Sequence, residues 1–141
     1  MEALNVAELP AGALLLVDSA PIIYTLEANE RFAQRFAPLF QRHAMGELVI
    51  AVTTITIAEV LTGPLKASEE ALAKRYRAVL DTWQVVDFTS AIAEGAARLR
   101  GTYGLKLPDA IQLASALEIN AHALVTHDRD FSQVRGMRVL A

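Results

Sequence analysis

The fold is decided by two neighbouring stretches, Leu105-Lys-Leu-Pro-Asp109-Ala-Ile-Gln-Leu-Ala-Ser-Ala-Leu117 and Ala123-Leu-Val-Thr-His-Asp128-Arg-Asp130-Phe131. Proline favours the first turn of a helix because its missing N–H would have no partner there, so a helix is expected to start at Pro108. Asp109 falls in that first turn, where the helix dipole favours an ionised carboxylate. The second stretch reads as a short buried strand that ends in two aspartates. We therefore expect three carboxylates near the carboxyl end of a strand, where α/β proteins place their ligands.

Strands and helices alternate along the rest of the chain. After a loose lead-in over residues 1–12, short apolar runs predict strands at 13–17, 48–52, 84–88, 122–126 and 137–140. Helical patterns occupy residues 22–26, 30–44, 55–61, 68–83, 91–102 and 108–117. Pro38 is expected to bend or split its helix, and Gly63-Pro64 to stop another. This alternation predicts an α/β fold, a three-layer α/β/α sandwich with a mainly parallel sheet of four to five strands, in a single domain over residues 1–141.

The composition limits the chemistry. Hydrophobic residues make up 53% of the chain and aromatic residues 6%, which predicts an aliphatic core, and the absence of cysteine excludes disulfides, thiol catalysis and cysteine-ligated zinc. The N-terminus lacks a signal-peptide pattern and no apolar run is long enough to span a membrane, so we expect a soluble, cytoplasmic protein. The net charge of −3 argues against a protein that coats nucleic acid nonspecifically. An acidic pocket surrounded by arginines is still compatible with a nucleic-acid substrate held through a cation.

Acids stand at four strand ends or helix starts: Asp18, Glu59, Asp109 and the pair Asp128/Asp130. Each has a structural explanation when taken alone. Asp18 or Ser19 can cap the next helix, Thr56-Ile-Ala-Glu59 matches a capping box, Asp109 suits a helix dipole and Asp128-Arg-Asp130 suits a turn. Jointly, however, several carboxylates in apolar surroundings need a cation or hydrogen-bond donors to compensate them. All-oxygen ligands favour Mg²⁺ or Mn²⁺, and acids around such an ion can promote hydrolysis of a phosphodiester.

The acids belong to four motifs in a fixed order: Leu16-Val-Asp18-Ser19, Thr54-x-x-x-Ala58-Glu59-Val60-Leu61, Leu107-Pro108-Asp109-Ala110-x-x-x-Ala114 and Leu124-x-Thr126-x-Asp128-x-Asp130-Phe131. Together they resemble PIN-domain ribonucleases, most closely the toxins of the VapBC toxin–antitoxin class, over nearly the whole chain. The resemblance implies a Mg²⁺- or Mn²⁺-dependent endoribonuclease that cuts single-stranded or structured RNA. It implies catalysis and metal binding by Asp18, Glu59, Asp109 and Asp128, help from Asp130, and hydrogen bonding within the site by Ser19 and Thr126. It also implies an antitoxin partner.

One segment departs from the family pattern. A long, Phe-rich helical segment lies between the first strand and Glu59, so substrate and partner surfaces there are not carried over. Its aromatic row Phe32/Phe36/Phe40, with Tyr24 and Leu26, exceeds what a small domain is expected to bury. We expect an exposed apolar patch and a homodimer. PIN-domain toxins, which this chain resembles, also pair two subunits.

Two other functions remain open at this stage. A phosphoacceptor signalling domain also uses strand-end aspartates and Mg²⁺, but needs a lysine after a late strand, where this chain has Thr126-His127-Asp128. A PIN-like fold kept for protein binding alone would not need all four acidic positions. Among other polar residues, Arg129 is a candidate for phosphate contact, whereas His127, His43 and His122 are expected to be incidental or structural, and Trp83 and Tyr103 to pack. Within the last motif, Phe131 is expected to anchor the turn, with Asp128 facing Asp109 and Asp130 nearer the rim.

Overall fold

The computed structural model of the protein describes residues 1–141 and contains one five-stranded sheet. All neighbouring strands are parallel. In spatial order they are β3 (Gln84–Val86), β2 (Leu48–Thr53), β1 (Ala13–Val17), β4 (Ala123–Val125) and β5 (Val139–Leu140). The expected mainly parallel sheet is thus entirely parallel.

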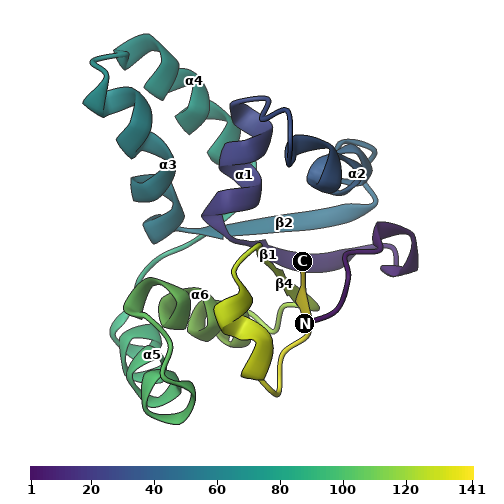
Figure 1. Cartoon of the computed structure of the whole chain (residues 1–141), viewed down its shortest axis with the longest axis vertical. Helices are drawn as coiled ribbons and strands as arrows, with labels where there is room; N and C mark the ends of the chain where they lie inside the picture. The colour runs from purple at the N-terminus through teal and green to yellow at the C-terminus, as the bar shows by residue number, and fades with distance from the viewer.

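Six α-helices cover the two faces of the sheet, which gives the three layers expected from the alternating pattern (Figure 1). They are α1 (Ser19–Leu26), α2 (Ala33–Ala44), α3 (Thr54–Lys66), α4 (Glu70–Leu80), α5 (Ser90–Tyr103) and α6 (Leu107–Glu118). The first four pack over one face, with Ile22, Phe36 and Leu39 in the core beneath them. The last two pack over the other face, around Ile92 and Leu113. None of these helices combines the length and apolar character that a bilayer crossing requires.

The chain changes direction at the central strand. From β1 it moves outward through β2 to β3, and it then returns to place β4 on the other side of β1. Val17 pairs with Val125, and the N–H of Asp18 donates to the carbonyl oxygen of Val125 at 2.8 Å, so the ends of β1 and β4 lie together. Open α/β sheets bind their ligands at such a switch point.

Several boundaries differ from the sequence expectation. The helix expected at 55–61 runs to Lys66, with Gly63 and a buried Pro64 inside it, so Gly63-Pro64 does not stop the helix. Helix α2 also continues through Pro38. It begins at Ala33, because the Asn29 carboxamide oxygen accepts from the N–H groups of Arg31 and Phe32 and forms a turn before it.

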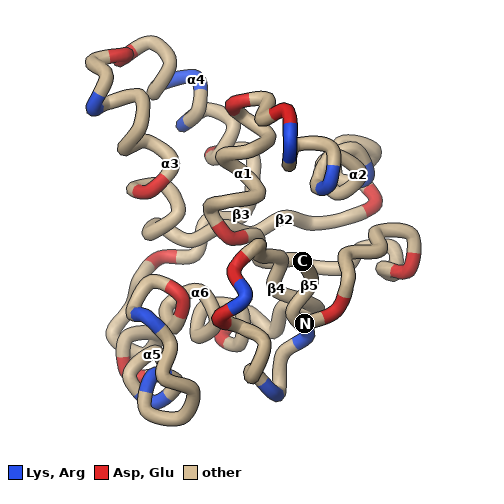
Figure 2. Tube along the Cα trace, viewed as in Figure 1, with Lys and Arg blue, Asp and Glu red and all other residues tan.

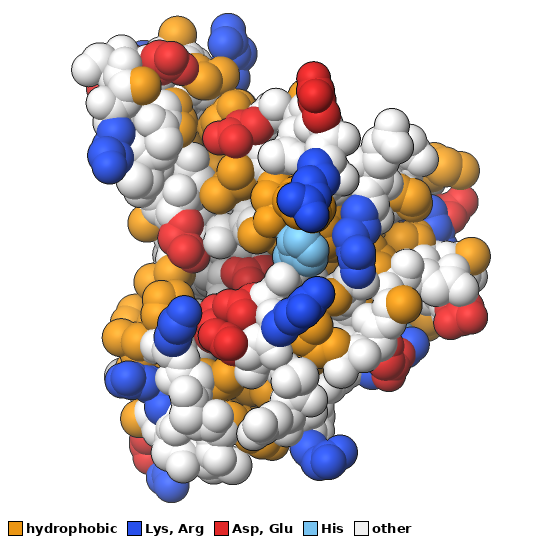
Figure 3. Space-filling model, viewed as in Figure 1, with side chains coloured by type: hydrophobic (Ala, Val, Ile, Leu, Met, Phe, Trp, Pro, Cys, Tyr) orange, Lys and Arg blue, Asp and Glu red, His pale blue; other side chains and the backbone are white.

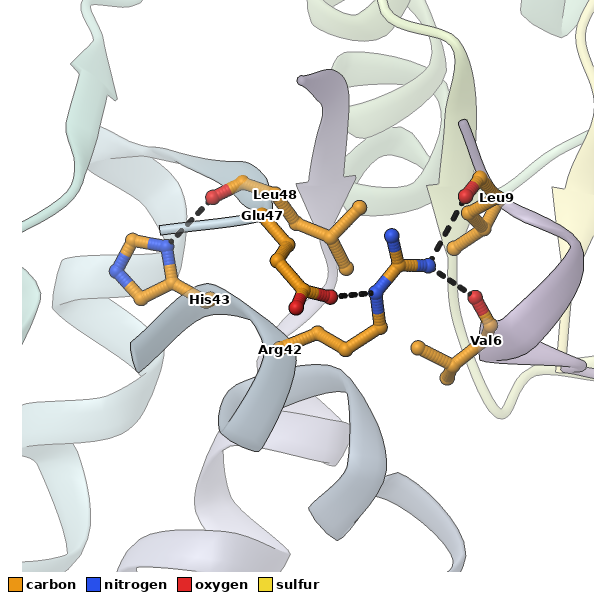
Figure 4. A network of polar contacts seen from close by, with 6 residues as sticks. All are labelled: Val6, Leu9, Arg42, His43, Glu47 and Leu48. Atoms are coloured by element: carbon orange, nitrogen blue, oxygen red, sulfur yellow. Dashed lines mark hydrogen bonds and ion pairs between the residues drawn. The ribbon is translucent and has the colours of Figure 1, made fainter. Parts of the chain in front are cut away.

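The first residues are better fixed than a loose lead-in. Glu2 bridges to Leu140, and the Leu4 N–H donates to the carbonyl oxygen of Ala141 at 2.9 Å. A 3₁₀ turn (Val6–Glu8) is held by Arg42, whose Nη1 donates to the carbonyl oxygens of Val6 and Leu9 and whose Nε donates to Glu47 at 2.7 Å (Figure 4). Arg42 therefore joins α2 to the segment before β1.

Candidate active site

A cavity of about 340 Å³ opens at the carboxyl ends of β1 and β4. Its walls include Asp18, Glu59, Asp109 and Asp128, so the structure brings the four acids named from sequence to one place. In Figure 2 the charged run after β4 lies beside the acidic start of α1, and Figure 3 shows acidic side chains gathered in a hollow of this face. Four segments far apart in sequence thus supply one concentrated negative charge.

Three of the carboxylates form the tightest group. Asp109, Asp128 and Asp130 each offer one oxygen, and these three oxygens lie within 4.8 Å of one another. Asp130 has a half-exposed side chain that lies 3.8 Å from the ammonium of Lys106, as expected near the rim, yet it is close enough to share a ligand with the other two. Asp18 and Glu59, which were also expected to bind metal, lie in the wall of the same cavity but are not in this group of three.

Asp109 occupies the third position of α6, after Leu107 and Pro108, and is 9% exposed. Its Oδ2 is buried without a hydrogen-bond partner. Burial raises the pKa of Asp109 to about 7, and a hydrogen bond that its protonated form shares with Asp128, together with the charges of Asp128, Asp18 and Asp130, adds to the rise. A buried, unpaired carboxylate oxygen beside two other carboxylates fits a hard divalent cation.

Asp128 and Phe131 organise the turn after β4. The Asp128 carboxylate accepts a hydrogen bond from the Asp130 N–H at 2.8 Å and caps the 3₁₀ helix Arg129–Gln133. Its own N–H donates to the Thr126 hydroxyl at 3.1 Å. Phe131 is 1% exposed and anchors the turn in the core, as the sequence predicted. Asp128 therefore caps this 3₁₀ helix and also lines the cavity.

Asp18 is buried and held by three donors. The Ser19 N–H donates to Oδ1 at 2.8 Å, which is the expected helix cap, the Thr126 hydroxyl donates to Oδ2 at 2.9 Å, and Gln112 Nε2 donates to Oδ1 at 3.1 Å. These donors come from α1, the end of β4 and α6. They fix the side-chain orientation of Asp18 and compensate its burial. Thr126 thus makes the hydrogen bond within the site that was expected of it.

Gln112 is the residue of this network that the sequence analysis missed. Its carboxamide also donates to the Thr56 hydroxyl at 2.7 Å and accepts from the Thr53 hydroxyl at 2.9 Å. Gln112 is 1% exposed, in the middle of a helix whose other buried residues are mostly apolar. A lone amide among apolar residues was the available signal, because buried polar side chains need partners.

Glu59 is not part of a capping box. The cap of α3 is Thr53, whose hydroxyl accepts from the Thr56 N–H at 3.2 Å, so Glu59 lies in the second turn. It is exposed on the open side of the cavity rather than buried among apolar residues as expected. Partial desolvation raises the pKa of Glu59 and the charge of Asp18 raises it further, while a hydrogen bond with Ser19 opposes the rise.

The histidines differ in their surroundings. His43 Nδ1 contacts the Leu48 carbonyl oxygen at 3.0 Å and His122 Nε2 contacts Arg138 at 3.2 Å, which are structural positions. His127 lines the cavity instead, with Nδ1 3.1 Å from the Tyr24 hydroxyl. Burial lowers the pKa of His127, so its imidazole is neutral near pH 7.

The aromatic row does not form the expected exposed patch. Phe36 is fully buried, while Tyr24, Phe32 and Phe40 are half-buried. Tyr24 and Phe32 contact each other with ring centroids 4.9 Å apart, and Phe40 lies 5.7 Å from Trp83. The expectation was wrong because Phe36 belongs to the core, Tyr24 and Phe40 pack against that core, and Phe32 packs on Tyr24 and His127.

The chain was compared with known protein families and solved structures, and both comparisons found matches. Residues 15–137 match the PIN domain family. A toxin–antitoxin complex from Klebsiella pneumoniae contains a chain that is 31% identical, with a TM-score of 0.70 over 90% of this chain and 96% of that one. VapBC2 from Rickettsia felis, bound to a promoter DNA fragment, gives 18% identity and a TM-score of 0.71 over 89% and 96%.

A third similar structure is VapC20 of Mycobacterium tuberculosis, described as a toxin that cleaves the sarcin–ricin loop. It has 16% identity and a TM-score of 0.65 over 84% of this chain and 92% of that one. At this identity, as for the Rickettsia protein, the likeness concerns the fold alone. No curated protein sequence matched the chain.

Proposed function

The chain belongs to the PIN-domain family, and we propose that it is a divalent-metal-dependent endoribonuclease that acts as the toxin of a toxin–antitoxin pair. The observation that carries this proposal is the buried, unpaired Oδ2 of Asp109, which lies in a group of three carboxylates at the sheet's switch point. The cytoplasm, where RNA and an antitoxin are both present, is the compartment that the proposal implies. We prefer this proposal to the phosphoacceptor alternative, which needs a lysine after a late strand, because β4 is followed by Thr126-His127-Asp128.

Asp109, Asp128 and Asp130 would hold Mg²⁺ or Mn²⁺, and Asp18 and Glu59 complete the acidic wall of the same cavity. When bound, the ion would polarise the phosphodiester and favour ionisation of the attacking water. The pKa of about 7 keeps Asp109 partly protonated at neutral pH in the metal-free protein, and this proton must leave when a cation binds, because cation ligands are deprotonated. Asp18 is already oriented by Gln112, Thr126 and the Ser19 N–H, so binding requires no reorientation of its carboxylate.

RNA is the proposed substrate, since the VapC20 fold neighbour is described as cleaving the sarcin–ricin loop, which is RNA. An antitoxin is the proposed partner, because the Klebsiella neighbour is a toxin–antitoxin complex and its matched chain is 31% identical. A homodimer is also proposed, because the PIN-domain toxins that this chain resembles pair two subunits; the aromatic row no longer supports it. Light scattering at micromolar concentration tests the dimer, and a monomeric mass would contradict it.

The test of the activity uses the purified chain and a single-stranded RNA with Mg²⁺, with Mn²⁺, and with EDTA. We expect cleavage only with metal, and its loss in Asp128→Asn. The matched control is Asp81→Asn, which removes the same charge from an exposed residue paired with Arg77 on α4. RNA cleavage that persists in EDTA or in Asp128→Asn would overturn the metal-site mechanism. Mapping the cut sites on total RNA then identifies the target.

A further inference from the structure

Three arginines that contact no acid surround His127 at the rim of the cavity. Arg31, Arg35 and Arg129 are exposed, and none of them takes part in the five ion pairs of the structure. Arg129 follows His127 in the chain and lines the cavity with it, while Arg31 and Arg35 adjoin Phe32 and Phe36, whose rings contact His127. Figure 3 shows this arrangement as a pale blue imidazole among blue side chains, directly beside the red acids. The sign of the charge therefore reverses across a short distance.

Hydrogen bonds from the backbone to Asn29 fix the position of the chain at Arg31. The Asn29 side chain accepts hydrogen bonds from the Arg31 N–H at 2.9 Å and the Phe32 N–H at 3.0 Å. The Arg31 guanidinium then lies over the Phe32 ring, 4.9 Å from its centroid, and this ring lies 4.8 Å from His127. Phe32 thus contacts the Arg31 guanidinium and meets His127 edge to face, and the cation–π contact fixes a guanidinium without neutralising it.

The other two arginines complete the same rim. Arg35 lies in the first turn of α2, one residue before Phe36, whose ring is 5.9 Å from His127. Arg129 separates Asp128 from Asp130 and lines the cavity itself. Arg31 lies on the Phe32 ring, which limits its hydration on that side and strengthens its attraction for an anion.

We propose that Arg31, Arg35 and Arg129, here called the arginine collar, bind a phosphate of the RNA strand adjacent to the phosphate that is cut. The inference rests on the proposed nuclease function and extends it to a second backbone site. A strand that places one phosphate at the carboxylates must lead away from them, and the collar offers unpaired guanidinium forks, which match phosphate oxygens in geometry. An acidic peptide fits less well, because its many carboxylates would face Asp128 and Asp130 at the same rim.

The test measures binding of a fluorescent single-stranded RNA by anisotropy in EDTA, where no cleavage is expected, at several NaCl concentrations. Arg31→Gln, Arg35→Gln and Arg129→Gln should each weaken binding by about 5- to 10-fold and lower the steepness of the salt dependence by about 0.7. The matched control is Arg75→Gln, an exposed arginine on α4 that is also outside the ion pairs. With Mg²⁺, Arg31→Gln and Arg35→Gln, which lie outside the cavity wall, should raise KM while kcat changes by less than about 2-fold.

The outcomes separate the two proposals. If the wild-type chain cleaves RNA and the three variants bind like Arg75→Gln, the collar is wrong and the nuclease function stands. If the wild-type chain cleaves no RNA but the variants lose binding, the nuclease function fails and the phosphate site stands. If hexaglutamate displaces RNA from the wild-type chain at equal concentration, the assignment of the collar to RNA is overturned.

Discussion

Gln112 Nε2 donates a hydrogen bond to Asp18 Oδ1 at 3.1 Å and joins the middle of α6 to the carboxylate that follows β1. The same carboxamide contacts Thr53 and Thr56 at the start of α3, the helix that carries Glu59. One buried side chain therefore links the elements that position three of the acids. We expect it to orient Asp18 without touching the substrate.

Replacing Gln112 with Leu should destabilise the protein by about 1–3 kcal/mol, because buried partners in Asp18, Thr53 and Thr56 would lose their hydrogen bonds. Chemical denaturation measures this change. The apparent Mg²⁺ affinity from thermal shifts should also fall about 10- to 100-fold, since Asp18 is no longer oriented. Gln41→Leu, an exposed change on α2, is the control and should alter neither quantity. Unchanged metal affinity in Gln112→Leu would show that the network only supports packing.

The metal-free protein should lose stability as the pH rises. The pKa of Asp109 is raised from 3.8 to about 7 in the folded state, mainly by burial. Between these two pH values the unfolded chain has released the proton and the folded chain still holds it, so this contribution to stability is fully present below about pH 4 and is lost as the pH rises through about 7. Glu59 acts in the same direction.

Asp109→Asn should not lose stability in this way as the pH rises, because its neutral amide does not ionise. Urea denaturation in EDTA should show that its advantage over wild type grows by about 1–3 kcal/mol between pH 5 and pH 8. Mg²⁺ should raise the melting temperature of wild type at pH 8 and leave that of Asp109→Asn nearly unchanged. Parallel pH profiles of the two proteins would contradict a raised pKa at Asp109.

The two aspartates of the last motif should differ in their contribution to catalysis. Asp128 lines the cavity, whereas Asp130 is half-exposed and lies 3.8 Å from Lys106. Asp128→Asn should lower single-turnover RNA cleavage by about 100-fold or more. Asp130→Asn should lower the cleavage rate by about 10-fold, and Mn²⁺ should partly restore that rate, as expected for a residue that supports the other ligands. The reverse order of the two variants would exchange their roles.

Substitution of Arg42 should lower the stability of the protein and leave its activity intact. Arg42→Met removes the donors for the carbonyl oxygens of Val6 and Leu9 and unpairs Glu47. The free energy of unfolding should fall by about 1–3 kcal/mol. Hydrogen exchange should increase in residues 2–9, while RNA cleavage stays within 2-fold of wild type, about the scatter expected of a distant site. Arg77→Met, which breaks an exposed ion pair on α4, should change stability by less than about 0.5 kcal/mol.

The sequence alone determined the layer architecture and the edge at which the acids meet. Apolar runs alternating with helical patterns encode local structure, and parallel strands necessarily bring their carboxyl ends together. The positions of Asp18 after β1 and of Asp128 after β4 followed from this rule. The helix start beside Asp109 followed from Pro108, whose effect on the backbone is local.

Only the tertiary structure decided how the site is divided and supported. It grouped Asp130 with Asp109 and Asp128, left Glu59 exposed, and placed Gln112 against Asp18 across 94 residues of sequence. It also turned the aromatic row inward, so that Phe32 packs on His127 and presents Arg31 at the rim. These relations depend on how side chains of separate elements meet once the helices have packed on the sheet. Periodicity along the chain carries no information about such distances.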